Sequence, residues 1–317
     1  MAQGKDMKII CGNSNIPFAE DVCRNIGLRL GNTYVSTFSD GEIAVSLNDS
    51  VRGSDVFIIQ STCTPINDHL MEMLIMVDAC KRASASRVTC VMPYFGYARQ
   101  DRKAKARDPI SAKLVANLIA SAGTDRVLTM DLHAAQIQGF FDIPVDNLVG
   151  SPLFVDYFHK KFKGANDTII VSPDIGSVAR ARAFALKMGL GLAIIDKRRE
   201  KANQAEVMNI IGSVEGKRVI LYDDMVDTAG SLCEAAIALV EKGGAKELYA
   251  CATHGVLSGD AIEKIERSTI KEVVFSDTIP LTGEKPCDKL KYLSAAPLFA
   301  EAISRIFEEV SISTLFR

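Results

Sequence analysis

Two adjacent carboxylates followed by a loop of small residues are the most informative group in the sequence. Asp223 and Asp224 come after an apolar stretch at residues 219–222, and residues 227–231 read Asp-Thr-Ala-Gly-Ser before a helical pattern begins. Backbone N–H groups and hydroxyls at a helix N-terminus can surround a phosphate, and small side chains let the backbone approach it. The paired acids could accept hydrogen bonds from the hydroxyls of a sugar that carries this phosphate. In a simpler alternative, Asp227 or Thr228 only caps the helix.

Further charged residues follow other short apolar runs. They are Arg99, Gln100 and Asp101; Asp131 and His133; Asp174; and Lys197, Arg198 and Arg199. Acids suit Mg²⁺ or sugar hydroxyls, and bases suit phosphates. A carboxylate and an imidazole could share one Mg²⁺, although imidazole is an unusual ligand for this ion. Each group also has a structural alternative, because residues 99–107 could be a solvated loop, and a histidine after a strand is often structural.

Two more segments carry chemistry of their own. Four of the five residues 197–201 are basic, which suits a clamp on a polyphosphate or an ordinary exposed charge run. At residues 38–42, Phe38 could stack on a purine while Asp40 or Glu42 accepts from its amino group. Asp40-Gly41 is also good β-turn chemistry, so a plain turn remains an alternative for this segment.

Short apolar runs with β-branched residues predict the strands that must position these groups. They lie at residues 8–11, 56–60, 88–94, 127–131, 168–172, 192–196, 218–222, 248–253 and 273–276. Helical spacing of apolar residues between them predicts helices, with inward faces formed by Leu70, Met73, Leu74 and Val77; by Leu114, Leu118 and Ile119; and by Leu232, Ala236, Leu239 and Val240. Alternating strands and helices predict parallel sheets, and ligands bind beyond the carboxyl ends of such strands.

Length and composition limit the class of protein. The 317 residues suggest about two domains, and a net charge of −2 argues against a general nucleic-acid binder. No apolar run is long enough for a membrane span and the N-terminus lacks a signal-peptide pattern, so we expect a cytoplasmic protein. Pro144, Gly150 and Pro152 punctuate the chain near the middle. We therefore expect domains at 1–148 and 149–317, with the C-terminal tail packing back on the first domain.

The 219–231 stretch resembles the binding loop shared by phosphoribosyltransferases and phosphoribosyl pyrophosphate synthetases. Residues 38–42, 93–102, 131–134, 171–174 and 197–199 extend the resemblance over nearly the whole chain, to the class I ribose-phosphate pyrophosphokinases. The resemblance implies an α/β fold of two phosphoribosyltransferase-like domains, each with a mainly parallel sheet flanked by helices. It also implies transfer of the β,γ-diphosphoryl group of ATP to O1 of ribose 5-phosphate, with phosphoribosyl pyrophosphate and AMP as products.

The same resemblance implies a role for each motif. Catalysis would rest on Lys197 and Arg199. ATP would be bound by Arg99, Gln100 and Asp101, and, from an adjacent subunit, by Phe38, Asp40, Gly41 and Glu42. Ribose 5-phosphate would be bound by Arg199, Asp223, Asp224, Asp227, Thr228, Ala229, Gly230 and Ser231. Mg²⁺ would be held at His133 and Asp174.

Regulation and assembly are implied in the same way. A regulatory site, with phosphate as an activator, would include Arg102, Gln138, Asp146, Asn147, Ser311, Ser313 and Phe316. The family implies a homo-oligomer, a hexamer, and no nucleic-acid or membrane partner. Ala135 stands where many regulated members have Ser, which departs from the regulatory pattern.

Two other functions remain open at this level. A phosphoribosyltransferase would use the same loop at residues 223–231 but needs no ATP motif, so residues 38–42 and 99–101 speak against it. A non-catalytic subunit that assembles with active relatives should have lost catalytic bases or metal ligands, and these are present in this chain.

Overall fold

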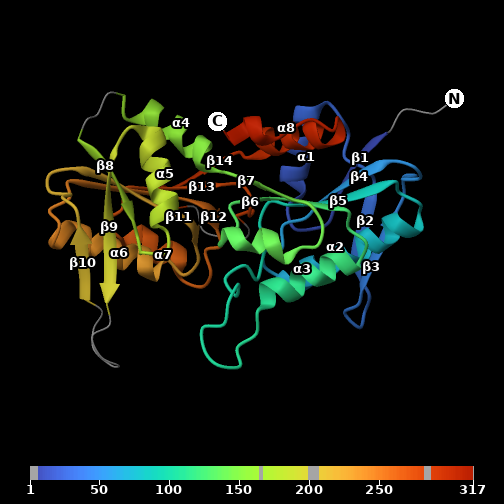
Figure 1. The fold of residues 1–317 in the computed structure, drawn as a ribbon, viewed down its shortest axis with the longest axis horizontal. Coiled ribbons are helices and arrows are strands. Elements are labelled where there is room, and N and C mark those ends of the chain that lie inside the picture. The colour runs from blue at the N-terminus through green and yellow to red at the C-terminus, as the bar shows by residue number, and fades with distance from the viewer. Residues whose placement is uncertain (1–5, 164–166, 199–206, 282–286, 317) are drawn as a thin grey trace. The chain divides into compact units, whose positions relative to one another are not determined.

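The chain forms two compact units (Figure 1). The computed structural model describes residues 6–163, 167–198, 207–281 and 287–316. Unit 1 comprises Met1–Val149, Asp277–Pro280 and Ser294–Arg317, and unit 2 comprises Gly150–Ser276 and Leu281–Leu293. The last segment of the chain therefore belongs with the N-terminal half.

Unit 1 is built on a parallel sheet with helices on both faces. In spatial order, its described strands are β1 (Met7–Cys11), β4 (Asp55–Ile59), β5 (Arg87–Met92), β6 (Arg126–Met130) and β7 (Val145–Leu148). Figure 1 shows α2 (Ile66–Arg82) and α3 (Ser111–Ser121) on one face, and α1 (Ile16–Ile26) and α8 (Ala296–Phe307) on the other. A separate antiparallel ribbon pairs β2 (Thr33–Thr37) with β3 (Ile43–Leu47). Two short 3₁₀ helices complete the unit, η1 (Ala135–Phe140) and η2 (Ser313–Phe316).

Aromatic packing and one arginine hold the returning helix α8 in unit 1. The rings of Phe18 in α1 and Phe299 in α8 meet edge to face with centroids 5.5 Å apart, a favoured geometry for aromatic pairs. Arg87 Nη2 donates to Asp55 Oδ2 at 2.6 Å and to the Ile306 carbonyl near the end of α8 at 3.1 Å. This arginine therefore connects two neighbouring strands to the C-terminal helix.

Unit 2 has a larger sheet that is parallel except at one edge. In spatial order, its described strands are β10 (Val207–Ile211), β9 (Gly191–Arg198), β8 (Thr168–Ser172), β11 (Arg218–Val226), β12 (Glu247–Gly255), β13 (Glu272–Ser276) and β14 (Leu290–Leu293), with β10 antiparallel to β9. The helices α4 (Ser151–Lys161) and α5 (Val178–Met188) cover one face, and α6 (Gly230–Glu241) and α7 (Ala261–Arg267) cover the other.

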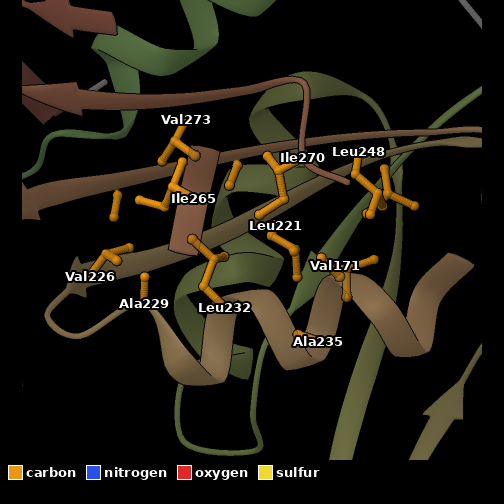
Figure 2. Close-up of a cluster of buried hydrophobic side chains, with 14 of the residues drawn as sticks. Val171, Leu221, Val226, Ala229, Leu232, Ala235, Leu248, Ile265, Ile270 and Val273 are labelled. Carbon is orange, nitrogen blue, oxygen red and sulfur yellow. The ribbon is translucent and has the colours of Figure 1, made fainter. Parts of the chain in front are cut away.

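The core under α6 and α7 shows why this part of the sequence folds as it does. Figure 2 shows Leu232 and Ala235 of α6 and Ile265 of α7 with Leu221 and Val171 of the sheet. Small alanines on α6 let the helix lie close to the strands, and the β-branched residues fill the pleated surface below. The carboxyl end of β11 is thereby anchored directly before the loop that leads into α6.

The sequence predicted the α/β class with parallel sheets correctly. Each of the nine predicted strands is present, although the bounds of some differ. It did not identify β2, β3, β7, β10 and β14. For α3 the predicted inward face was right at Ile119 but wrong at Leu114 and Leu118, which are exposed (59% and 42%), whereas Val115 is buried. Alanines Ala112 and Ala116 share the inward face, and a pattern that counts only large apolar residues underweights them.

Close contact joins the loops after β4 and β5. Thr62 N donates to the Tyr94 carbonyl at 3.0 Å, and Gly96 N donates to Thr62 Oγ1 at 2.6 Å. A Cβ atom at Gly96 would lie 2.4 Å from the Thr62 carbonyl oxygen, closer than real Cβ contacts come. Glycine is thus required where the loop carrying Arg99 and Gln100 begins.

We predict that Gly96→Ala lowers the free energy of unfolding by about 1–3 kcal/mol, the typical cost of inserting atoms into a packed region. The matched control is Gly139→Ala, because no atom lies within 4 Å of the Cβ position there. Denaturant unfolding of both variants measures the difference. Equal stability of the two variants would contradict the steric argument.

Candidate active site

The two acids of β11 have different surroundings. The strand continues to Val226, four residues beyond the predicted end, so Asp223 and Asp224 lie inside it. Successive residues of a strand point to opposite faces, which gives Asp224 the side of Tyr222. Tyr222 stacks on Phe184 of α5, and Asp224 is only 2% exposed. The expected pair of sugar-facing carboxylates is therefore divided, and Asp223 is the more accessible of the two.

Side chains that follow β8 hold both acids. Arg180 Nη1 donates to Asp224 Oδ1 at 2.6 Å and lies 3.5 Å from Asp223 Oδ1. Ser177 Oγ donates to Asp223 Oδ1 at 2.8 Å, and the backbone N–H of Asp224 donates to the same oxygen at 2.9 Å. The sequence analysis missed Ser177 and Arg180. The only available signal was their position a few residues after Asp174.

Electrostatics make Asp223 an unusual carboxyl group. Burial and the neighbouring Asp224 carboxylate raise the pKa of Asp223 to about 7, while the hydrogen bond from Ser177 acts in the opposite direction. Perturbed acids of this kind are concentrated at functional sites, although structural charge networks also produce them.

Asp174 lies beside this cluster in the loop after β8. Its Oδ1 accepts from the backbone N–H of Ser177 at 2.8 Å, and its carbonyl accepts from Ser172 Oγ at 2.8 Å. The carboxylate is exposed. Among the described residues, no group of three or more His, Cys, Asp or Glu side chains is placed to hold a metal ion.

The small-residue loop after β11 leads directly into α6. Ala229 has φ of 57°, a left-handed conformation that is uncommon for a residue with a Cβ. In the described structure no side chain caps α6, which begins at Gly230, and Thr228 and Ser231 are exposed. Ser258 N donates to the Asp227 carbonyl at 3.0 Å and fixes the start of the loop. Backbone N–H groups at such a terminus can bind an anion.

The basic run is only partly described. Lys197 lies near the end of β9, where its backbone pairs with Met208 of β10. Arg199 lies outside the described residues. The strand thus reaches one residue past Lys197, further than the predicted end at residue 196.

In unit 1, residues 38–42 form the turn between β2 and β3. Phe38 N donates to the Glu42 carbonyl at 2.7 Å, and Asp40 Oδ1 accepts from Glu42 N at 3.2 Å. Gly41 has φ of 96°, a left-handed conformation that favours glycine. The Phe38 ring is 60% exposed. The turn therefore presents an aromatic face and two exposed carboxylates at the end of the ribbon.

The other unit 1 motifs follow β5 and β6. Arg99 and Gln100 are exposed, and Gln100 hydrogen-bonds to Ser111 at the start of α3. Gln136 of η1 donates to Asp101 Oδ2 at 2.7 Å, so this carboxylate connects the loop to η1. Arg99, Gln100 and Asp101 are thus fixed at the same edge of the sheet.

After β6, His133 is exposed, and the preceding Asp131 has φ of 41°. Asn147 Oδ1 accepts from Leu132 N at 3.1 Å and supports this loop from β7. His133 and Asp174, the expected Mg²⁺ ligands, belong to different units.

Two of the expected regulatory residues line a cavity of about 480 Å³ in unit 1. Asp146 and Ser311 face it together with Arg126, whose Nη1 donates to Asp146 Oδ2 at 2.5 Å. Ser313 donates its backbone N–H to Ser311 Oγ at 3.2 Å. Arg102 and Gln138 are exposed elsewhere in the unit. Phe316 lies in η2, where the structure describes its backbone alone.

Comparison with known proteins decides which family carries this arrangement. Residues 7–123 match the model of the N-terminal domain of ribose phosphate pyrophosphokinase, and residues 199–317 match the phosphoribosyl synthetase-associated domain. The ribose-phosphate pyrophosphokinase of Caldanaerobacter subterraneus subsp. tengcongensis is 63% identical over 310 residues, 98% of each chain. The chain belongs to the ribose-phosphate pyrophosphokinase family. The enzyme of the same name from Bacillus caldolyticus is 57% identical over 98% of each chain.

A solved structure agrees with the family assignment. Phosphoribosylpyrophosphate synthetase from Mycobacterium smegmatis matches with a TM-score of 0.91 and 40% identity, over 96% of this chain and 100% of that chain. The chain is therefore a diphosphotransferase that forms phosphoribosyl pyrophosphate from ATP and ribose 5-phosphate, as the sequence motifs predicted. The alternative of a phosphoribosyltransferase is not supported. None of the described helices is both long enough and apolar enough to cross a membrane.

The raised pKa of Asp223 predicts how its replacement changes stability with pH. The folded protein keeps a proton that the unfolded chain, with the ordinary value of 3.8, releases. The stability that Asp223 contributes is thus fully present below pH 3.8 and is lost as the pH rises to about 7. We expect the stability of Asp223→Asn relative to the native enzyme to increase over this window and to be constant above it.

Denaturant titrations without Mg²⁺ at several pH values measure this difference. Asp156→Asn, which changes an exposed carboxylate of α4 in the same unit, is the control. A pH-independent difference for Asp223→Asn would show that the carboxyl titrates normally.

Proposed function

We propose that unit 2 of this ribose-phosphate pyrophosphokinase binds ribose 5-phosphate and that unit 1 supplies the ATP contacts. The observation that carries this assignment is the strained Ala229 at the uncapped start of α6, six residues after Asp223, the carboxyl group with the raised pKa. A left-handed non-glycine residue costs free energy, and such strain is concentrated at functional sites. Asp227, Thr228, Ala229, Gly230 and Ser231 are the proposed cradle for the 5-phosphate.

The sugar hydroxyls would be bound next to this cradle. Asp223 lies close to the loop in sequence, is the more accessible of the two acids, and as a carboxylate accepts hydrogen bonds from hydroxyls. Asp224 is almost completely buried, which favours a role in positioning its neighbours rather than direct binding of the sugar.

ATP would contact the loops of unit 1. Arg99 and Gln100 are exposed beyond β5, and Asp101 is held on the same edge by Gln136. We further propose that Phe38, Asp40, Gly41 and Glu42 serve the site of a neighbouring subunit. Their position at the exposed tip of the β2–β3 ribbon supports this role, because a projecting turn can reach a second chain. The assembly is proposed to be a homo-oligomer, a hexamer.

Lys197 and Arg199 would stabilise the group that is transferred. In the reaction, O1 of ribose 5-phosphate attacks the β-phosphorus of ATP, the bond to the α,β-bridging oxygen breaks, and AMP leaves. Positive side chains lower the barrier when they neutralise charge on the transferring group. A lysine supplies a point charge and an arginine supplies a planar fork, and both suit phosphate oxygens.

His133 and Asp174 are the proposed contacts for Mg²⁺. Mg²⁺ usually keeps several waters and binds through one or two protein ligands plus substrate phosphates, so a cage of three side chains is not needed. The exposed Asp174 carboxylate, with one oxygen fixed by Ser177 N, fits such a contact. When bound, the ion would neutralise phosphate charge on ATP.

The cavity beside Asp146 and Ser311 is the proposed regulatory site, with phosphate as an activator. Arg126 and Arg87 also line it, and arginines are suited to anions. The cytoplasm is the proposed compartment, which is supported by the eight cysteines all being unpaired.

We predict that Asp227→Ala raises the KM for ribose 5-phosphate far more than the KM for ATP, because this residue begins the proposed phosphate cradle. Steady-state kinetics with each substrate varied in turn measure both constants. Similar increases in both would contradict the assignment.

We predict that Lys197→Ala lowers kcat by about a hundredfold or more, on the order of 3 kcal/mol, with only a small change in the KM for ATP. Arg199→Ala should behave alike, and Arg199→Lys should recover little activity because the fork is lost. Arg198→Ala removes one charge from the same run and is the matched control, with a milder effect. A normal kcat for Lys197→Ala would refute this mechanism.

Subunit mixing tests the proposed role of the β2–β3 turn. A Phe38→Ala/Glu42→Ala variant and a Lys197→Ala variant should each be nearly inactive. After subunit exchange, the mixture should recover measurable activity. Some active sites then combine an intact β2–β3 turn from one subunit with an intact Lys197 from the other. No recovery despite verified exchange would place both motifs in the site of one subunit.

A further inference from the structure

Arg180 occupies a position that is electrostatically unfavourable for a cation. It lies in the first turn of α5, where the partial positive charge of the helix dipole repels a guanidinium group. The Asp224 carboxylate at 2.6 Å and the Asp223 carboxylate at 3.5 Å offset this repulsion. Arg180 thus contacts both acids at once. Its place in the helix is therefore explained by the acids and not by the helix.

Fold stability alone is a weak reason for such an arrangement. Buried ion pairs are often no more stabilising than apolar residues of the same size, because both charges must lose their hydration. Asp224 is almost completely buried, so loss of Arg180 would remove a positive charge that compensates its carboxylate. The effect of the Arg180–Asp224 ion pair on Asp223 explains its presence at the end of β11 better than a contribution to fold stability does.

The hydrogen bonds that Asp223 accepts are all on one oxygen. Oδ1 accepts from Ser177 Oγ and from Asp224 N, and it lies near Arg180. No hydrogen bond from a described residue to Oδ2 is found, and the side chain is 26% exposed. The carboxylate is thus held in one orientation, with its second oxygen left for a ligand.

We propose that Arg180 is a positioning residue for sugar binding. It neutralises the buried Asp224 and, with Ser177, fixes Asp223 so that Oδ2 accepts from a ribose hydroxyl. This inference rests on the proposed ribose 5-phosphate site and adds a division of roles within it. Asp223 contacts the sugar, whereas Asp224 and Arg180 form a supporting pair that does not touch it.

Kinetics of variants that are matched in side-chain length test the proposal. Arg180→Met keeps a similar side-chain length without the charge, and should raise the KM for ribose 5-phosphate by about tenfold, the loss expected from one weakened charge-assisted hydrogen bond. The kcat and the KM for ATP should change much less. Arg182→Met, an exposed arginine on the same helix, is the control and should leave all three constants unchanged.

A second substitution separates positioning from folding. Asp224→Asn removes the charge that Arg180 neutralises, so the Arg180→Met/Asp224→Asn enzyme should regain most of the affinity that Arg180→Met loses. Arg180→Lys should also recover part of it, because it restores the charge. If Arg180→Met alone does not fold, as judged by thermal unfolding, the Lys variant and the double variant carry the same comparison.

Three results would overturn the proposal. They are an unchanged KM for ribose 5-phosphate in Arg180→Met, an equal loss in kcat and in both KM values, and no recovery in the double variant. The Asp227→Ala measurement separates these failures from a failure of the site itself. If Asp227→Ala raises the KM for ribose 5-phosphate but Arg180→Met does not, the sugar site stands and the role of Arg180 is refuted.

Discussion

Strands that run in the same direction force the loops that follow them to the same edge of a sheet, and both units depend on this constraint. In unit 2 it places the loop after β8, with Asp174 and Ser177, beside the end of β11 with Asp223. In unit 1 it places the loops after β5 and β6, with Arg99 and His133, at one edge. Residues far apart in sequence are thereby collected at one edge of each sheet.

Charge balance at the end of β11 then decides how these residues are used. Two adjacent carboxylates repel each other, and burial adds to the cost of ionising both. Asp224 is buried in an ion pair with Arg180, and the pKa of Asp223 is raised to about 7. The end of β11 is suited to a ligand with hydroxyl donors next to an anionic phosphate, because a carboxylate accepts hydrogen bonds from hydroxyls and the N–H groups at the start of α6 can bind an anion.

The sequence predicted the buried strands well, because a parallel strand covered on both faces is a nearly continuous apolar run. It did not identify β2 or β10, which lie outside the buried part of a sheet and lack such runs. It placed the charged motifs near strand ends, but it ended β11 four residues early and so treated Asp223 and Asp224 as equivalent. Arg180 could not be found from sequence, because its role depends on a contact across 44 residues that no local pattern encodes.

The enzyme transfers two phosphoryl groups together, so the fate of the β-phosphorus is the sharpest test of its reaction. The purified enzyme is incubated with ribose 5-phosphate, Mg²⁺ and ATP labelled at the β-phosphorus, and the products are separated. We expect the label to move to the sugar product while unlabelled AMP appears in equal amount. Label retained in ADP, with a singly phosphorylated C1 on the sugar, would mean ordinary γ-phosphoryl transfer and would contradict it.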